Sequence, residues 1–157
     1  MYMVIPSPQI IEFDPQYESQ VKQMIFTVVS ELGFPISRTP YQYKDLDHIS
    51  ERYQGRSRFW IALLHDRIIG SIAIKEVDKQ TARLRRMFVL PGFHGKGVGD
   101  KLLATALSFA QKNNYEVINL KTHKFMTRAH RFYEKHGFQK IRESKNELYY
   151  QLQLDKT

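Results

Sequence analysis

The sequence predicts an α+β fold in which helices flank one mixed β-sheet, and three observations support this prediction. Apolar residues recur at helical spacing between Val21 and Leu32. Residues 59–64 and 68–77 have the composition of two strands joined by a tight turn, which predicts an antiparallel hairpin. A strand, a helix and another strand follow between residues 82 and 121, and the usual β-α-β rule predicts that these two strands are parallel, with a right-handed crossover.

The other elements follow from caps, breaks and apolar spacing. Asp14 is a candidate N-cap with Pro15 at the first helical position, so a helix is predicted to begin there. Gly33 and Pro35 are predicted to end this helix. The helix after the strand 82–90 ends at residues 113–114, two asparagines that tolerate the left-handed conformation. The remaining predicted elements are a strand at 9–13, a short helix at 44–53, a strand at 116–121, a helix at 125–136 closed by Gly137, and strands at 139–141 and 148–154.

Length and composition exclude several classes of protein. The 157 residues predict a single domain spanning positions 1–157. The chain has no cysteine, which excludes a disulfide framework, a thiolate zinc site and a cysteine acyl-enzyme, and no metal site is expected. No apolar run approaches the ~20 residues of a membrane span, and the first nine residues do not resemble a signal peptide. We therefore expect a cytoplasmic protein without a membrane partner.

The formal net charge of +8 is compatible with nucleic acid, a membrane or an anionic ligand as partner. The basic residues are dispersed and form no repeated module typical of nucleic-acid-binding proteins, so a nucleic-acid partner is not expected and that role is the least favoured alternative. Several basic side chains instead flank the two motifs described next, where their field would attract a phosphate-bearing ligand. These residues are His94, Lys96, Lys101, Lys124, Arg128 and Arg131.

A glycine-rich loop joins the strand 82–90 to the following helix. Gly95, Gly97 and Gly99 lack Cβ atoms where the chain enters the helix, so several N–H groups can converge on one anion at the positive end of the helix dipole. The spacing fits neither the dinucleotide fingerprint G-x-G-x-x-G nor the Walker loop, in which a Ser or Thr would follow Lys96. The loop is therefore predicted to bind phosphate without matching either of these motifs.

Two motifs together resemble those of one enzyme family. The loop resembles the pattern [QR]-x-x-G-x-[GA] of the GCN5-related N-acetyltransferase (GNAT) family, with His94 where Gln or Arg is usual. Residues 129–138 resemble the family's A-x-x-F-Y-E-K-x-G-F segment. The resemblance covers Phe59 to the C-terminus. It implies the acetyl-CoA N-acyltransferase fold, a mixed and mostly antiparallel sheet with a central parallel strand pair that splays apart, flanked by helices.

The resemblance also implies roles for particular residues. Acetyl-CoA would be the cosubstrate, with main-chain groups of Met87, Phe88 and Val89 contacting it and stabilising the oxyanion of the reaction. Tyr133 would contact the cofactor and act as the acid that helps the thiolate leave. The loop residues implied to bind the cofactor are His94, Gly95, Lys96, Gly97, Val98, Gly99 and Asp100.

This chain departs from the family pattern at two positions. Many relatives carry a catalytic Glu on the strand before the loop, whereas this chain has Arg83, which cannot accept a proton. Glu76 acting through water, His123 and water alone remain alternatives for the base. Met126 stands where relatives often place an Asn that bonds the cofactor.

The predicted function is direct transfer of an acetyl group from acetyl-CoA to a primary amine of unknown identity. A coenzyme-A-binding sensor without activity is the alternative, because the usual base and Asn are absent. The segment 34–58 is predicted to shape the acceptor pocket with Tyr41, Tyr43, Asp45, Asp47 and Tyr53. Arg83 and Arg85 are predicted to alternate onto one strand face with Met87, which favours an acceptor with a carboxylate over a polyamine. The sequence does not decide between a monomer and a homodimer.

Overall fold

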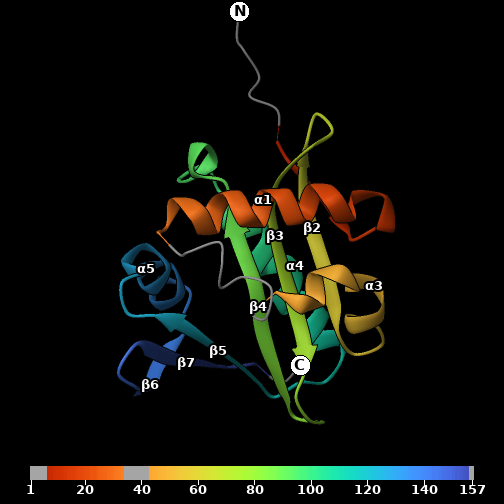
Figure 1. The fold of residues 1–157 in the computed structure, drawn as a ribbon. Helices are drawn as coiled ribbons and strands as arrows, with labels where there is room; N and C mark the ends of the chain where they lie inside the picture. The colour runs from red at the N-terminus through yellow and green to blue at the C-terminus, as the bar shows by residue number, and fades with distance from the viewer. Residues whose placement is uncertain (1–6, 34–42, 156–157) are drawn as a thin grey trace, which may run out of the picture.

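The computed structural model describes residues 7–33 and 43–155, and Figure 1 shows their arrangement. The strands of this part form one seven-stranded sheet in the order β1-β2-β3-β4-β5-β7-β6. The strands are β1 (Gln9–Glu12), β2 (Arg58–Leu64), β3 (Arg67–Glu76), β4 (Thr81–Val89), β5 (Val117–His123), β6 (Gln139–Glu143) and β7 (Glu147–Gln153). The α-helices are α1 (Glu18–Glu31), α3 (Ile49–Arg52), α4 (Val98–Lys112) and α5 (Thr127–Lys135), and short 3-10 helices are η1 (Pro15–Tyr17), η3 (Lys44–Asp47) and η4 (Pro91–Phe93).

The mixed sheet confirms the predicted fold class. β4 and β5 are parallel, whereas every other neighbouring pair in the sheet is antiparallel. The predicted hairpin is β2–β3, and its two turn residues His65 and Asp66 both have positive φ, of 48° and 64°. Two successive residues in this conformation give the turn a twist that matches that of the flanking strands.

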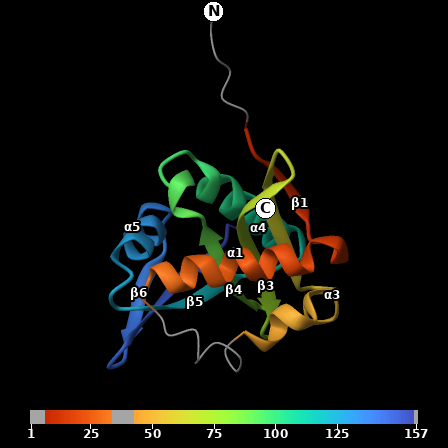
Figure 2. The same cartoon turned by 45° about the horizontal axis from the view of Figure 1, so that its top comes forward.

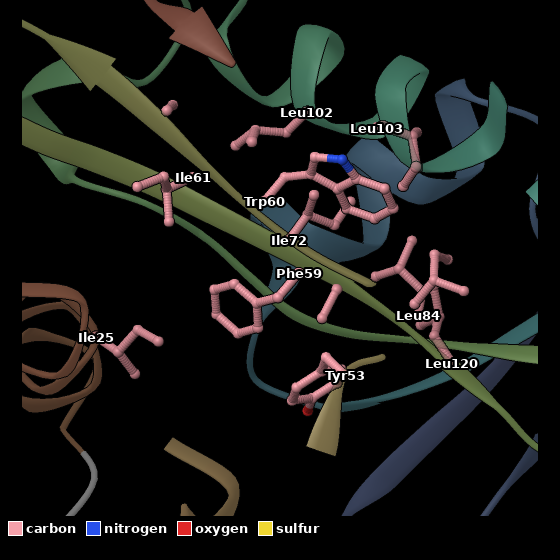
Figure 3. Close-up of a cluster of buried hydrophobic side chains, with 14 of the residues drawn as sticks. Ile25, Tyr53, Phe59, Trp60, Ile61, Ile72, Leu84, Leu102, Leu103 and Leu120 are labelled. Atoms are coloured by element: carbon pink, nitrogen blue, oxygen red, sulfur yellow. The ribbon is translucent and has the colours of Figure 1, made fainter. Parts of the chain in front are cut away.

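The two faces of the sheet are covered by different helices. Helix α1 crosses one face and α4 lies behind the other, as Figures 1 and 2 show. In Figure 3, Trp60 and Ile72 point to the α4 side with Leu102 and Leu103, while Phe59 points to the α1 side. These side chains are nearly or fully buried, and the Trp60 ring meets Phe109 of α4 edge to face at 5.2 Å. The core therefore lies in two layers, one on each side of the sheet.

The N-cap predicted at the start of the first helix is confirmed. The Asp14 carboxylate accepts a hydrogen bond from the Gln16 amide at 3.0 Å, with Pro15 in the first turn. This first turn is the 3-10 helix η1, and α1 begins at Glu18. Gly33 follows the helix with a φ of 90°. The buried residues of α1 are Val21, Met24, Ile25, Val28 and Val29.

The prediction of one continuous helix at 44–53 is wrong, because two short helices occupy this segment. His48, with φ −146° and ψ 48°, separates η3 from α3. Asp45 and Leu46 of η3 and Ile49 of α3, on the two sides of this break, are buried. Tyr41, predicted to line the acceptor pocket, lies outside the described residues.

Candidate active site

The central parallel pair of strands separates like a fork. β4 and β5 are paired at Thr81–Val117, Ala82–Ile118 and Arg83–Asn119, and beyond these three pairs they diverge although β4 continues to Val89 and β5 to His123. His123 lies two residues beyond the predicted strand 116–121, but in the structure it is the last residue of β5. Because parallel strands end at the same edge, the fork opens toward the glycine loop that follows β4.

The backbone of β4 directs two amide groups into this fork. The Leu90 amide donates to the Ile69 carbonyl at 2.9 Å, and the Ser71 hydroxyl donates to the Arg86 carbonyl at 2.7 Å, so both backbone groups point to β3. In a planar trans peptide the C=O of one residue is opposite to the N–H of the next. The Met87 amide therefore points away from β3, toward the fork. Alternation gives Val89 the same direction and turns the Phe88 amide to β3.

The sequence predicts main-chain contacts to the cofactor from Met87, Phe88 and Val89, but their amides do not all point the same way. Met87 and Val89 offer amides on the fork side, whereas Phe88 is paired with Ser71 on the β3 side. The Val89 carbonyl also faces the fork and accepts a hydrogen bond from His94 Nε2 at 2.9 Å. His94 thus fixes the start of the glycine loop to the end of β4.

A β-bulge lies immediately before these amides. Ala73 of β3 pairs with Arg85 and Ser71 pairs with Phe88, so the single residue Ile72 is opposite two residues of β4. Arg86 has a φ of 54°, a left-handed conformation that costs a residue other than glycine about 1–2 kcal/mol. The bulge interrupts the alternation of side chains along β4. The prediction that Met87 shares one face of the strand with Arg83 and Arg85 is therefore wrong. The Met87 side chain instead lies beside Gly99 of α4.

A buried ion pair holds the bulge on the α1 side of the sheet. Arg86 Nε and Nη2 donate to the two oxygens of Asp45 at 3.0 and 2.6 Å, and the Tyr53 hydroxyl donates to the same carboxylate at 2.6 Å. The side chains of Asp45 and Arg86 are only 7% and 10% exposed. Burial alone would raise the pKa of Asp45, but the hydrogen bonds and charge of Arg86 outweigh it and lower that pKa below its ordinary value. The Arg86 guanidinium also lies 4.6 Å from the centre of the Tyr43 ring.

The glycine loop has the geometry of an anion site. Gly95 and Gly97 have φ values of 75° and 82°, and Gly97 is the N-cap residue of α4 without a side-chain cap. The Lys101 amide makes the first helical bond, to the Gly97 carbonyl at 3.1 Å. The amides of Val98, Gly99 and Asp100 therefore precede the hydrogen-bond ladder of the helix and point from its positive end.

The start of α4 is packed closely against α5. A Cβ built on Gly99 would lie 3.2 Å from the ring of Phe132 and 3.3 Å from the end of Met87, so Gly99 is required by packing rather than by its φ. The Asp100 carboxylate contacts His136 Nε2 at 2.6 Å and lies 3.9 Å from Lys135 Nζ. These contacts place basic groups around an acidic residue that stands in the first turn of the proposed phosphate site.

Tyr133 lies on α5 with its ring packed in an aromatic cluster. The ring centres of Phe132, Phe138 and Tyr150 are 5.6, 5.5 and 6.3 Å away, and the residue is 6% exposed. Burial raises the pKa of the hydroxyl. None of the described residues bonds this hydroxyl, yet no fully buried side-chain oxygen of that part of the chain lacks a partner. The hydroxyl must therefore reach accessible space, where it can donate a hydrogen bond to a ligand.

The candidates for a base are placed very differently. Glu76 pairs with Ala82 near the start of β4, at the end of the strand opposite the loop, and its carboxylate bonds Arg56 Nη1 at 2.5 Å. The structure thus separates Glu76 from the fork. His123 ends β5 on the fork side, and its carbonyl accepts a hydrogen bond from His130 Nε2 at 2.8 Å. Met126 precedes α5, and its sulfur accepts a hydrogen bond from the Thr122 hydroxyl at 3.7 Å.

Two hollows of the described surface lie elsewhere. One of about 340 Å³ lies between α1 and the β2–β3 turn and reaches Leu90, and another of about 210 Å³ lies beside α3 and includes Tyr53 and Arg58. Neither is lined by a residue of the glycine loop. Backbone direction and chemistry, rather than the size of a hollow, therefore identify the fork as the candidate active site.

Two further properties concern only residues 7–33 and 43–155. No group of three or more His, Cys, Asp or Glu side chains there could hold a metal ion. Over the same residues, no helix combines the length and the apolar character needed to cross a membrane.

Comparison with known proteins agrees with this geometry. An acetyltransferase from Streptococcus agalactiae superposes with a TM-score of 0.84 at 27% identity, over 96% of this chain and 100% of that one. An acetyltransferase from Bacillus anthracis, crystallised with acetyl coenzyme A, superposes with a TM-score of 0.61 at 30% identity over 67% of this chain and 68% of that one. The first likeness extends over nearly the whole chain and the second over about two thirds of it.

Sequence relatives point the same way. N-acetylaspartate synthetase from Danio rerio is 36% identical over 91 residues, which are 57% of this chain and 32% of the relative. The chain thus spans about a third of the length of that curated relative. Residues 25–138 match the model of the acetyltransferase (GNAT) family. The chain therefore belongs to the GNAT family of acetyl-CoA-dependent N-acetyltransferases.

Proposed function

We propose that this protein transfers an acetyl group from acetyl-CoA directly to a primary amine at the β4–β5 fork. The observation that carries the proposal is the joint placement of two sets of amides. The Met87 and Val89 amides point into the fork, and the amides that begin α4 lie just beyond the loop that follows it. The first set fits a thioester and its pantetheine chain, and the second fits a pyrophosphate.

The described residues suggest how the transfer proceeds. Acetyl-CoA supplies the acetyl group as a thioester. The amine nitrogen forms a bond to the carbonyl carbon, the carbon–sulfur bond breaks, and a proton of the amine passes to water or to His123. Tyr133 is proposed to donate a hydrogen bond to the departing sulfur. Because burial raises the pKa of Tyr133, its hydroxyl stays protonated at neutral pH and stabilises the thiolate without giving up its proton fully.

The first test is turnover with a panel of amines. Release of free thiol from acetyl-CoA should be measured with amino acids, peptides and polyamines, and mass spectrometry should identify the acetylated product. The name of the relative from Danio rerio places aspartate in this panel. Binding of acetyl-CoA without turnover of any amine would contradict the proposal and favour a coenzyme-A-binding protein without activity.

Direct transfer has its own test. The chain has no cysteine to carry an acyl group, and a ternary complex needs none. Intact-protein mass spectrometry after treatment with acetyl-CoA should show the unmodified mass. A stoichiometric acetyl adduct that an amine then discharges would contradict direct transfer.

A further inference from the structure

We propose that Arg85, assisted by Lys75, binds a carboxylate of the acceptor, so that the acceptors are small amines with a carboxylate, above all free amino acids. The inference rests on the proposed function and names its substrate class. The two side chains come from neighbouring strands on the α1 side of the sheet, beside Tyr53 and the buried Asp45–Arg86 pair.

The bulge brings two successive arginines to the same carboxylate. Regular alternation would place Arg85 and Arg86 on opposite faces of β4. Because Arg86 is the bulged residue, both guanidinium groups face Asp45. Asp45 is taken by Arg86, which bonds both of its oxygens, while Arg85 Nη2 stays 4.0 Å from it.

Arg85 differs from Arg83 of the same strand and from Arg56 and Arg58 near the start of β2. Arg83 Nε donates to Asn119 at 2.9 Å, Arg56 bonds Glu76 and two carbonyls, and Arg58 bonds Glu12 and two carbonyls. Arg85, in contrast, makes no hydrogen bond with its guanidinium in the described part of the chain. Its side chain is 34% exposed, so the donors are partly withdrawn from water and still open to a ligand.

The charges around Arg85 do not balance. Among the residues that the structure describes, Lys75, Arg85 and Arg86 face the single carboxylate of Asp45. The Lys75 ammonium lies 5.2 Å from the centre of the Tyr53 ring and donates to the Arg52 carbonyl. Burial, and after it the charges of Arg85 and Arg52, lower the pKa of Lys75. An anion bound here would relieve this repulsion and satisfy the donors of Arg85.

The position of Arg85 also limits the size of the acceptor. It precedes Met87, whose amide points into the fork, by two residues across the bulge, which is at most roughly 7 Å along the strand. A free amino acid can place its amine at the fork while its carboxylate meets the arginine side chain. A long polyamine would instead bring positive charge to Lys75 and Arg85.

The test compares matched acceptors and matched variants. L-aspartate and L-glutamate should be acetylated with KM values at least tenfold below those of the corresponding neutral diamides and of spermidine, because charge-assisted hydrogen bonds are stronger than neutral ones. In Arg85→Gln, the KM for the amino acid should rise roughly tenfold or more, while the KM for acetyl-CoA changes less than about twofold. Arg83→Gln is the control, since it loses the same charge from the same strand while glutamine keeps a donor for Asn119.

Two results would overturn the inference. One is a wild-type enzyme that acetylates the neutral diamides or spermidine as well as the amino acids. The other is an Arg85→Gln variant that behaves like Arg83→Gln. If no amine at all is acetylated, the proposed function fails, and the carboxylate site is tested by binding alone. Succinate should then raise the melting temperature of the wild type and of Arg83→Gln but not of Arg85→Gln, and equal shifts in all three would disprove the site.

Discussion

Replacing Asp45 by Asn should destabilise the protein strongly, although the side chain keeps its shape. Asn removes the charge that compensates Arg86 and places an NH₂ group where one oxygen accepted hydrogen bonds. Both partners are at least nine-tenths buried, and breaking such a pair from one side typically costs about 3–5 kcal/mol. For a domain of this size, 1 kcal/mol corresponds to about 2–4 °C, so the melting temperature should fall by about 6–20 °C.

Urea titration of the wild type and the variant measures this loss as a lower midpoint of unfolding. The slope of the unfolding free energy against urea concentration should be the same for both proteins. Asp47→Asn is the matched control, because Asp47 lies two residues away and pairs with Lys22 at the surface, with 56% of its side chain exposed. That variant should unfold at nearly the wild-type midpoint. If Asp45→Asn unfolds like Asp47→Asn, the buried pair does not stabilise the protein and does not hold the bulge.

The same pair predicts the pH dependence of this difference. The pKa of Asp45 is lowered in the folded state, so its stabilisation is fully present above the unfolded value of about 3.9 and is lost as the pH falls through the lower folded pKa. The gap in unfolding free energy between the wild type and Asp45→Asn should therefore be constant from pH 5 to 7 and shrink below about pH 4. A gap that widens on acidification would contradict this assignment.

Two predictions concern cofactor binding and catalysis. Gly97→Glu places a carboxylate at the start of α4, so acetyl-CoA should no longer raise the melting temperature of this variant. Gly97→Ala, which carries only the cost of a φ of 82°, should keep part of that shift. An undiminished shift in Gly97→Glu would show that the loop is not the phosphate site. Tyr133→Phe keeps the ring in its aromatic cluster but loses the hydroxyl, so kcat should fall about tenfold to a hundredfold while the Kd for acetyl-CoA changes little. A wild-type rate, with chemistry shown to be rate-limiting, would make Tyr133 a packing residue.

The parts of the site that depend on local chemistry could be predicted from the sequence. Gly95 and Gly97 adopt positive φ, and α4 begins directly after them, because turn and helix start are encoded within a few residues. The parallel arrangement of β4 and β5 also follows from the order of the elements.

The bulge could not be predicted in this way. An arginine adopts positive φ only when its surroundings impose it, and here the partner is Asp45, 41 residues earlier in the chain. Regular alternation of side chains predicts that Met87 lies on the same face of β4 as Arg85, and the bulge at Arg86 makes this prediction wrong. The displacement of Glu76 from the fork has a similar origin, because the register between β3 and β4 fixes its position and no local pattern reveals that register.

The fork also has a mechanical consequence. Three residue pairs join β4 to β5, so the sheet consists of two blocks, β1 to β4 and β5 with β7 and β6. A ligand that bonds the free edge of β4 and also touches α5 bridges these blocks, and its departure removes the bridge. Each round of product release would then loosen one block against the other. Amide hydrogen exchange along the diverging ends of β4 and β5 should therefore slow when acetyl-CoA is bound and quicken again when it leaves.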